Sequence, residues 1–191
     1  TIRQIQVFNK RGVQPDYIEE GPVKVVTSKH LGRKSIEYES LDRTSLEEWK
    51  KSTDAQVKRF DILTYATGAY VGRTNCFLED DKALASNHLN ILRVKHLKPA
   101  YVAVFLNSIL GQMQVRRLAS GSAQVELYPS DVSKFLVWKA PKDIQQKIVT
   151  LVQQSHEAGR KARGLLNVAT TMAEETIREQ MLSKTVQSRA S

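Results

Sequence analysis

Two adjacent arginines, Arg116 and Arg117, stand shortly before the sequence Gly121-Ser122-Ala123-Gln124. Arginines and small polar residues on turns contact phosphate oxygens, and a glutamine or arginine at a base edge forms the paired hydrogen bonds that distinguish adenine or guanine. A nucleotide phosphate, a substrate or a nucleic acid would fit such residues. Similar polar groups occur earlier, and together they form the candidate binding set: Lys29, His30, Arg33, Lys34, Tyr70, Arg73, Thr74, Asn75, Arg116, Arg117, Ser120, Ser122 and Gln124.

Each of these residues also has a simpler interpretation. Arg116 and Arg117 are expected at the C-terminal end of a helix, where the helix dipole alone favours cations by some tenths of a kcal/mol. The remaining residues, taken one by one, are compatible with an ordinary solvated surface.

The overall charge favours a polyanionic partner. The chain of 191 residues contains 29 Lys and Arg against 20 Asp and Glu, a net charge of +9. Such a charge attracts nucleic acid and anionic membrane surfaces alike. The single cysteine, Cys76, excludes an intramolecular disulfide and indicates a reducing, cytoplasmic setting. We expect no membrane insertion, because no apolar run approaches the roughly 18 residues of a spanning helix and the first residues lack the apolar core of a signal peptide.

Several kinds of catalytic site have no counterpart in the sequence. No Gly-x-Gly occurs, so neither a dinucleotide fingerprint nor a P-loop can be written. The four histidines lack a second ligand at metal spacing, and we predict no metal site. No two prolines are adjacent, which excludes the Pro-Pro-aromatic loop of amino-methyltransferases. Asp16, Glu48 and Lys50 resemble a nuclease triad, but Glu48 falls in a predicted helix turn and not on a strand.

The first 141 residues have the pattern of one mixed α+β domain. Alternation and β-branched residues predict strands at 23–28, 36–38, 88–94 and 135–138, and a hairpin of 61–66 and 70–72 around Thr67-Gly68-Ala69. Capping-box spacing predicts a short helix within 42–51, and apolar residues three and four apart predict one helix over 99–118.

A long helix is predicted after Pro141. Apolar and small residues recur alternately at four and three residues, which is a heptad pattern typical of helix pairing. We expect a dimerisation or spacer helix at 142–182 and a disordered tail at 183–191; the alternative is an exposed terminal helix lying partly on its own domain. The predicted interface consists of Ile144, Ile148, Leu151, Ala158, Ala162, Leu165, Ala169 and Met172.

The order of these features resembles a type I restriction-modification specificity subunit. The resemblance runs from about Arg11 to about Arg178 and rests on the order and spacing of several short motifs, none of which is specific alone. These are Gly12-Val-Gln-Pro15-Asp-Tyr17 through Gly21, Asp61-Ile62-Leu63 with Gly68 and Gly72-Arg73, Leu106-Asn107-Ser108 with Gly111-Gln112, Gly121-Ser-Ala-Gln124, and Pro141 with Gln145-Gln146 before the long helix.

The resemblance implies an α+β DNA target recognition domain at residues 1–141, followed by a helix that pairs as an antiparallel coiled coil. The chain would then be a non-catalytic subunit reading one half of a bipartite DNA target, with the candidate set above as its DNA-binding residues. S-adenosylmethionine and magnesium would be held only by partner methyltransferase and restriction subunits, and the chain itself would hold no cofactor.

Two departures from the family pattern bear on the partners. Such subunits carry two recognition domains and two long helices, whereas this chain has one of each and resembles a half subunit that pairs with a copy of itself, or an excised half. The usual Gly-Ser-Thr-Gln is here Gly121-Ser122-Ala123-Gln124.

The alternative function is a helix-mediated adaptor that no longer reads DNA.

Overall fold

The computed structural model describes residues 1–121 and 124–189, with side chains through residue 179. It divides into a globular unit, residues 1–152, and a second unit that begins at Gln153 and consists of the continuing helix. Within the described residues, no helix combines the length and apolar character needed to cross a membrane.

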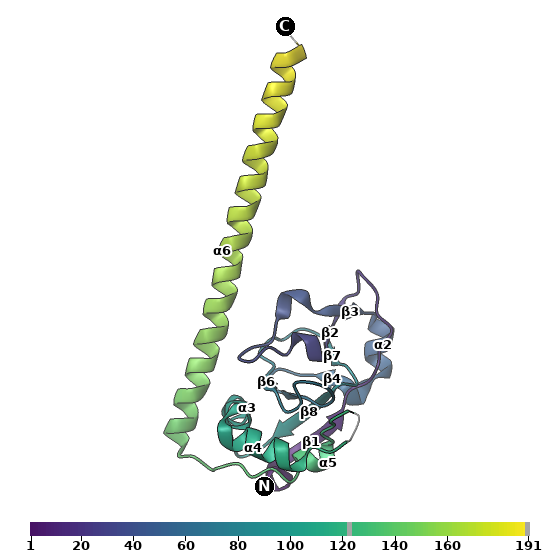
Figure 1. The fold of residues 1–191 in the computed structure, drawn as a ribbon, viewed down its shortest axis with the longest axis vertical. Coiled ribbons are helices and arrows are strands. Elements are labelled where there is room, and N and C mark those ends of the chain that lie inside the picture. Colours follow the sequence, from purple (N-terminus) through teal and green to yellow (C-terminus); the bar gives the residue numbers. More distant parts are fainter. Residues whose placement is uncertain (122–123, 190–191) are drawn as a thin grey trace. The chain divides into compact units, whose positions relative to one another are not determined.

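Two four-stranded sheets form the framework of the globular unit (Figure 1). The first is antiparallel, in the order β1 (Gln6–Arg11), β8 (Leu89–Val94), β5 (Ile62–Tyr65) and β6 (Thr74–Cys76). The second has the order β3 (Asp42–Thr44), β2 (Val23–Val26), β7 (Ala83–Ala85) and β4 (Gln56–Val57), and only its β2–β7 pair is parallel. The mixed α+β class is therefore confirmed.

Short helices and turns connect and cover the sheets. The α-helices of the globular unit before its last element are α1 (Ile2–Ile5), α2 (Leu46–Lys51), α3 (Pro99–Asn107), α4 (Ile109–Leu118) and α5 (Pro129–Val132). Three 3-10 turns are η1 (Ser28–His30), η2 (Tyr38–Ser40) and η3 (Thr53–Ala55).

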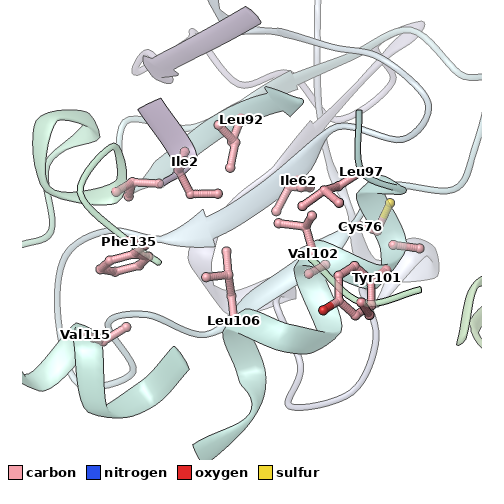
Figure 2. Packing of buried hydrophobic residues seen from close by; sticks show 14 of the residues in the cluster. Ile2, Ile62, Cys76, Leu92, Leu97, Tyr101, Val102, Leu106, Val115 and Phe135 are labelled. Atoms are coloured by element: carbon pink, nitrogen blue, oxygen red, sulfur yellow. The ribbon is translucent and has the colours of Figure 1, made fainter. Parts of the chain in front are cut away.

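Both faces of the first sheet contribute to the core. Successive side chains of a strand point to opposite sides, and here the two sides enter two different hydrophobic clusters. On β5, Ile62 belongs to the cluster shared with α3 and α4, whereas Leu63 belongs to the cluster shared with the second sheet. On β8, Leu92 and Ile91 divide in the same way. Figure 2 shows the first of these clusters, in which α3 places Tyr101, Val102 and Leu106 against the sheet. The unit is thus layered as helices, first sheet, second sheet.

The predicted helix over 99–118 is in fact two helices. Ser108 adopts an extended conformation, ends α3 and caps α4, with its hydroxyl accepting a 3.5 Å hydrogen bond from the Gly111 amide. A Cβ on Gly111 would lie 2.2 Å from the Leu106 carbonyl oxygen, so the close approach at this break requires glycine. The apolar spacing that predicted a single helix continues across this break because α3 and α4 pack against the same core.

Other predicted elements shift or disappear. The second hairpin strand is 74–76 and not 70–72, and residues 70–72 are part of the connecting loop. The prediction of a strand at 135–138 was wrong: these residues form no sheet pairing, and Leu136 and Trp138 are more than 60% exposed. The predicted strand at 36–38 contributes only one isolated bridge, between Leu31 and Ile36.

The last helix, α6 (Lys142–Arg189), begins in the globular unit and continues as the second unit. Its first turns dock through Gln145, Ile148, Val149 and Val152: Gln145 accepts from the Lys98 amide at 3.0 Å and donates to the Ala140 carbonyl at 2.8 Å. The helix extends beyond the predicted end at residue 182, into the segment expected to be a disordered tail.

Candidate nucleic-acid interface

The loop between β5 and β6 is fixed to the helices by two side-chain amides. β6 is an edge strand, and Asn107 bonds the backbone of Thr74: its Oδ1 accepts from the Thr74 amide at 2.9 Å and its Nδ2 donates to the Thr74 carbonyl. Gln112 Nε2 donates to the Gly72 carbonyl at 3.1 Å and to the Leu106 carbonyl at 2.9 Å. The loop is therefore held from both sides, and the edge strand is closed to other strands.

Gly72 lets α4 approach this loop. Its φ is +88°, and an added Cβ would lie 2.5 Å from both methyl groups of Val115. Only glycine meets both requirements without strain. Val115 is followed by Arg116, which is exposed, so the packing of Gly72 brings the end of α4 beside the hairpin loop.

Four of the predicted binding residues meet at one cavity beside the loop. Arg33 and Lys34, from the segment after η1, line it together with Tyr70 and Arg73 from the hairpin loop; its volume is about 490 Å³. The Arg73 guanidinium lies 4.1 Å from the centroid of the Tyr70 ring, and its Nη1 donates to the Leu31 carbonyl at 3.0 Å. The stacked and anchored guanidinium has further N–H donors for a ligand.

A second loop lies against the same hairpin. Ser120 and Glu126 exchange backbone hydrogen bonds of 3.0 and 2.7 Å, and the Gly68 amide donates to the Val125 carbonyl at 3.2 Å. Ser120 and Gln124 are exposed. The fold thus brings two predicted groups, far apart in sequence, to neighbouring loops. Ser122, also predicted, lies outside the described residues.

Arg11 connects these loops and was not among the predicted residues. Its Nε donates to the Asn87 carbonyl at 2.6 Å, its Nη2 donates to the Thr67 hydroxyl, and its guanidinium lies 3.5 Å from the Glu126 carboxylate. A hydrogen bond from Tyr128, with the charge of Arg11 adding to it, lowers the pKa of Glu126. Arg11 is the last residue of β1, and nothing in the sequence around it indicated that it would connect the two loops.

Some predicted residues are committed to the protein itself. Thr74 and Asn75 are at least 95% buried; Asn75 donates to the Gly32 carbonyl at 2.9 Å and thereby holds the Arg33 segment to β6. His30 is also buried, and its Nδ1 accepts from the Thr27 amide at 2.9 Å. Desolvation lowers the pKa of His30, so it remains neutral near pH 7. These residues position the loops.

The remaining cations differ in their surroundings. Lys29 forms a 2.7 Å ion pair with Asp42, and Arg117 lines a separate apolar groove on α4. Within the described residues, Arg33, Lys34 and Arg116 are exposed and take part in no ion pair. Of these three, Arg33 and Lys34 line the cavity, and such uncompensated cations suit an anion such as a phosphate. In the same described part of the chain, no group of three His, Cys, Asp or Glu side chains is placed to hold a metal ion.

Comparison with known proteins gives similarity in structure and not in sequence. No family model matches the chain, and no curated protein matches its sequence. A solved chain of a type I R-M system, from work on complex assembly and conformational transition, aligns with a TM-score of 0.52 and 16% identity, over 78% of this chain and 36% of its own length. The type I restriction-modification S subunit from M. genitalium aligns with a TM-score of 0.47 and 15% identity, over 71% of this chain and 32% of its own.

The chain therefore spans about a third of the length of the solved chains it matches. The similarity covers the mixed α+β architecture that the sequence resemblance implied. The fold of this chain is similar to that of a solved chain from a type I R-M system.

Proposed function

We propose that this chain is a DNA-reading specificity subunit of a type I restriction-modification system that recognises one half of a bipartite double-stranded target. The observation that carries the proposal is the cavity lined by Arg33, Lys34, Tyr70 and Arg73, with the Gln124 loop beside it. The fold similarity supports the same function. A donor-rich, cationic, loop-built surface on a rigid sheet is what sequence reading of DNA requires.

We assign different tasks to these residues. Arg33 and Lys34 have long, exposed side chains, which suits phosphate contacts that position the protein without reading sequence. Arg73 is held by a carbonyl and an aromatic ring, so its guanidinium has a fixed direction. A fixed fork of donors suits the O6 and N7 atoms of guanine.

Titration of mixed-sequence duplex DNA at two salt concentrations tests the proposal. Binding should weaken strongly with salt, and replacing Arg33 and Lys34 by alanine should reduce the slope of log K against log salt by about 2. The alternative, a helix-mediated adaptor, requires negligible binding at both salt concentrations.

A variant of Arg73 distinguishes sequence-specific DNA reading from non-specific electrostatic binding. Arg73→Ala should weaken binding to the preferred duplex by ~1 to 3 kcal/mol and change binding to random duplex less. An equal loss on both duplexes would make Arg73 a phosphate contact.

We further propose that two copies pair antiparallel through α6. The predicted seam is symmetric about residue 160: Ala158 then faces Ala162 of the second copy, Leu151 faces Ala169, and Ile148 faces Met172. The two alanines let the helices approach closely at the centre, and the outer layers combine a larger with a smaller or flexible residue, as interdigitated helices need. Leu151, Leu165 and Met172 are about 60% exposed, so this face is free to pair, although Ile148 also packs on its own globular unit.

Sedimentation of two variants tests the pairing. Ala162→Glu places two carboxylates in a desolvated seam near the two-fold axis and should abolish dimers at micromolar concentration. Asn167→Glu, on the exposed outer face, is the matched control and should leave them intact. A dimer that survives Ala162→Glu contradicts the seam.

Catalysis is assigned to partner methyltransferase and restriction subunits. The purified chain, supplied with S-adenosylmethionine or magnesium, should leave DNA unmethylated and uncut until those subunits are added. Turnover by the chain alone would overturn this assignment.

A further inference from the structure

An apolar groove lies between α4 and the irregular segment that follows α5. Its volume is about 730 Å³, and its walls include Leu110 and Met113 on one side and Leu136 and Trp138 on the other. These four side chains are 57% to 63% exposed. So many large apolar side chains in one exposed patch are typical of a protein–protein contact.

Hydrogen bonds hold the walls of the groove in place without a partner. Gln114 bridges its walls: the Gln114 Oε1 accepts from the Leu136 amide at 2.6 Å and its Nε2 donates to the Leu136 carbonyl at 3.0 Å. The Trp138 carbonyl accepts from the Tyr101 hydroxyl at 2.6 Å. A preformed groove loses little conformational entropy when it is filled.

The rim of the groove is cationic. Arg117 and Lys134 line it, and no carboxylate does so among the described residues. Lys134 is paired with Asp131 at 2.8 Å, whereas Arg117 takes part in no ion pair of the described part of the chain. The complementary occupant is an apolar helix flanked by a carboxylate.

The later part of α6 carries such a surface. Beside the pairing seam, Leu166, Thr170, Ala173 and Ile177 recur at intervals of four, three and four residues and form a second stripe on an adjacent face. Leu166 and Ile177 are 66% and 58% exposed. Glu174 flanks this stripe on the side away from the seam. A two-helix pair covers the seam and leaves the second stripe without a partner.

Antiparallel pairing brings the stripe to the other copy's globular unit. With symmetry about residue 160, residues 166–177 of one copy lie level with residues 143–154 of the other. The first turns of α6, through Val152, belong to the globular unit, and Trp138 precedes α6 by only four residues. The groove is thus on the body that the stripe reaches.

We propose that this groove receives the Leu166–Ile177 stripe of a second copy, with Glu174 of that copy at the Arg117 rim. The inference rests on the proposed antiparallel pairing and adds a second contact to it, made twice in the symmetric dimer. The contact would hold each globular unit against the partner helix and so fix the spacing between the two DNA-reading surfaces.

Sedimentation equilibrium of the full chain, with charge reversal at the rim, tests this contact. Arg117→Glu and Glu174→Arg should each weaken the dimer by roughly tenfold or more, and the two changes in one chain should restore it. Met113→Glu, at a wall residue that is 58% exposed, should weaken it without restoration by either partner change. Val7→Glu is the control, because Val7 is 61% exposed outside the groove.

The outcomes separate this contact from the pairing itself. A parent chain that is monomeric at about ten micromolar overturns both. A dimer that is lost in Ala162→Glu but unchanged in Met113→Glu and Arg117→Glu overturns the groove contact alone. If those groove variants leave the dimer intact but prevent binding of a methyltransferase subunit, the groove serves that subunit and the proposal is wrong. Far-UV circular dichroism spectra equal to the parent's confirm that the variants fold, because loss of the dimer by itself lowers the thermal midpoint.

Discussion

Replacing Asn107 by leucine isolates the clamp that holds the hairpin loop. The Asn107 amide satisfies both the N–H and the carbonyl of Thr74, a residue that is 99% buried. Leucine is of similar size but offers no hydrogen bond, so two backbone groups lose their partner. Each buried unsatisfied group costs about 1–3 kcal/mol. Because Asn107 itself is only half-buried, water compensates in part, and we expect a loss of about 2–3 kcal/mol in the free energy of unfolding.

Urea unfolding of the full chain, followed by tryptophan fluorescence, measures this loss as a fall in the midpoint at unchanged slope. Val104→Ala, on the exposed side of the same helix, is the control and should change the free energy of unfolding by less than about 0.5 kcal/mol. Asn107→Leu should also weaken DNA binding, because it releases the hairpin loop that carries Arg73. A change at Asn107 as small as the control's would refute the clamp.

Three further perturbations have defined outcomes. Gly72→Ala meets a positive φ and the Val115 methyls together, and should lower the free energy of unfolding in urea by about 2–4 kcal/mol; a neutral result would contradict the packing. Arg93→Leu leaves the buried carboxylate of Asp61, now bound at 2.7 Å, without its counter-ion and should cost about 3–5 kcal/mol in the same assay. Burial lowers the pKa of His30 from 6.5, so the unfolded chain binds a proton at this residue more tightly than the folded chain does. The free energy of unfolding should therefore fall as the pH drops below about 6.5, by up to about 1.4 kcal/mol per pH unit. His30→Gln should flatten this dependence, and a variant with the same pH dependence as the parent would exclude His30 as its source.

Periodicity predicted the elements that bury regular faces. The strands at β5 and β8 and the start of α2 follow directly from alternation and from the cap at Ser45, whose hydroxyl accepts from the Glu48 amide at 3.0 Å. β4 and β7 are two and three residues long, too short for any period to register. The run at 135–138 was predicted as a strand because it is apolar; Phe135 is buried, but Leu136, Val137 and Trp138 line an open groove instead.

The sequence predicted the types of residue at the candidate site but not which of them come together in space. Arg33 and Arg73 were chosen for their chemistry, but only the folded sheets bring them to one cavity. Sequence reasoning took Asn75 for a binding residue, whereas its amide is used internally to support the Arg33 segment. Asn107 and Gln112 lay within the motifs that carried the family resemblance, and in this chain both amides hold the hairpin loop.

Selection from a randomised duplex library tests most directly whether this chain reads DNA sequence. Bound DNA from successive rounds is sequenced for the parent chain and for Arg73→Ala. We predict that the parent enriches one sequence in two inverted copies separated by a fixed, unread spacer, because a two-fold pair of readers requires an interrupted palindrome. Arg73→Ala should lose preference at one position of each half while retaining the spacer. A parent chain that binds the library but enriches no sequence would contradict the central claim.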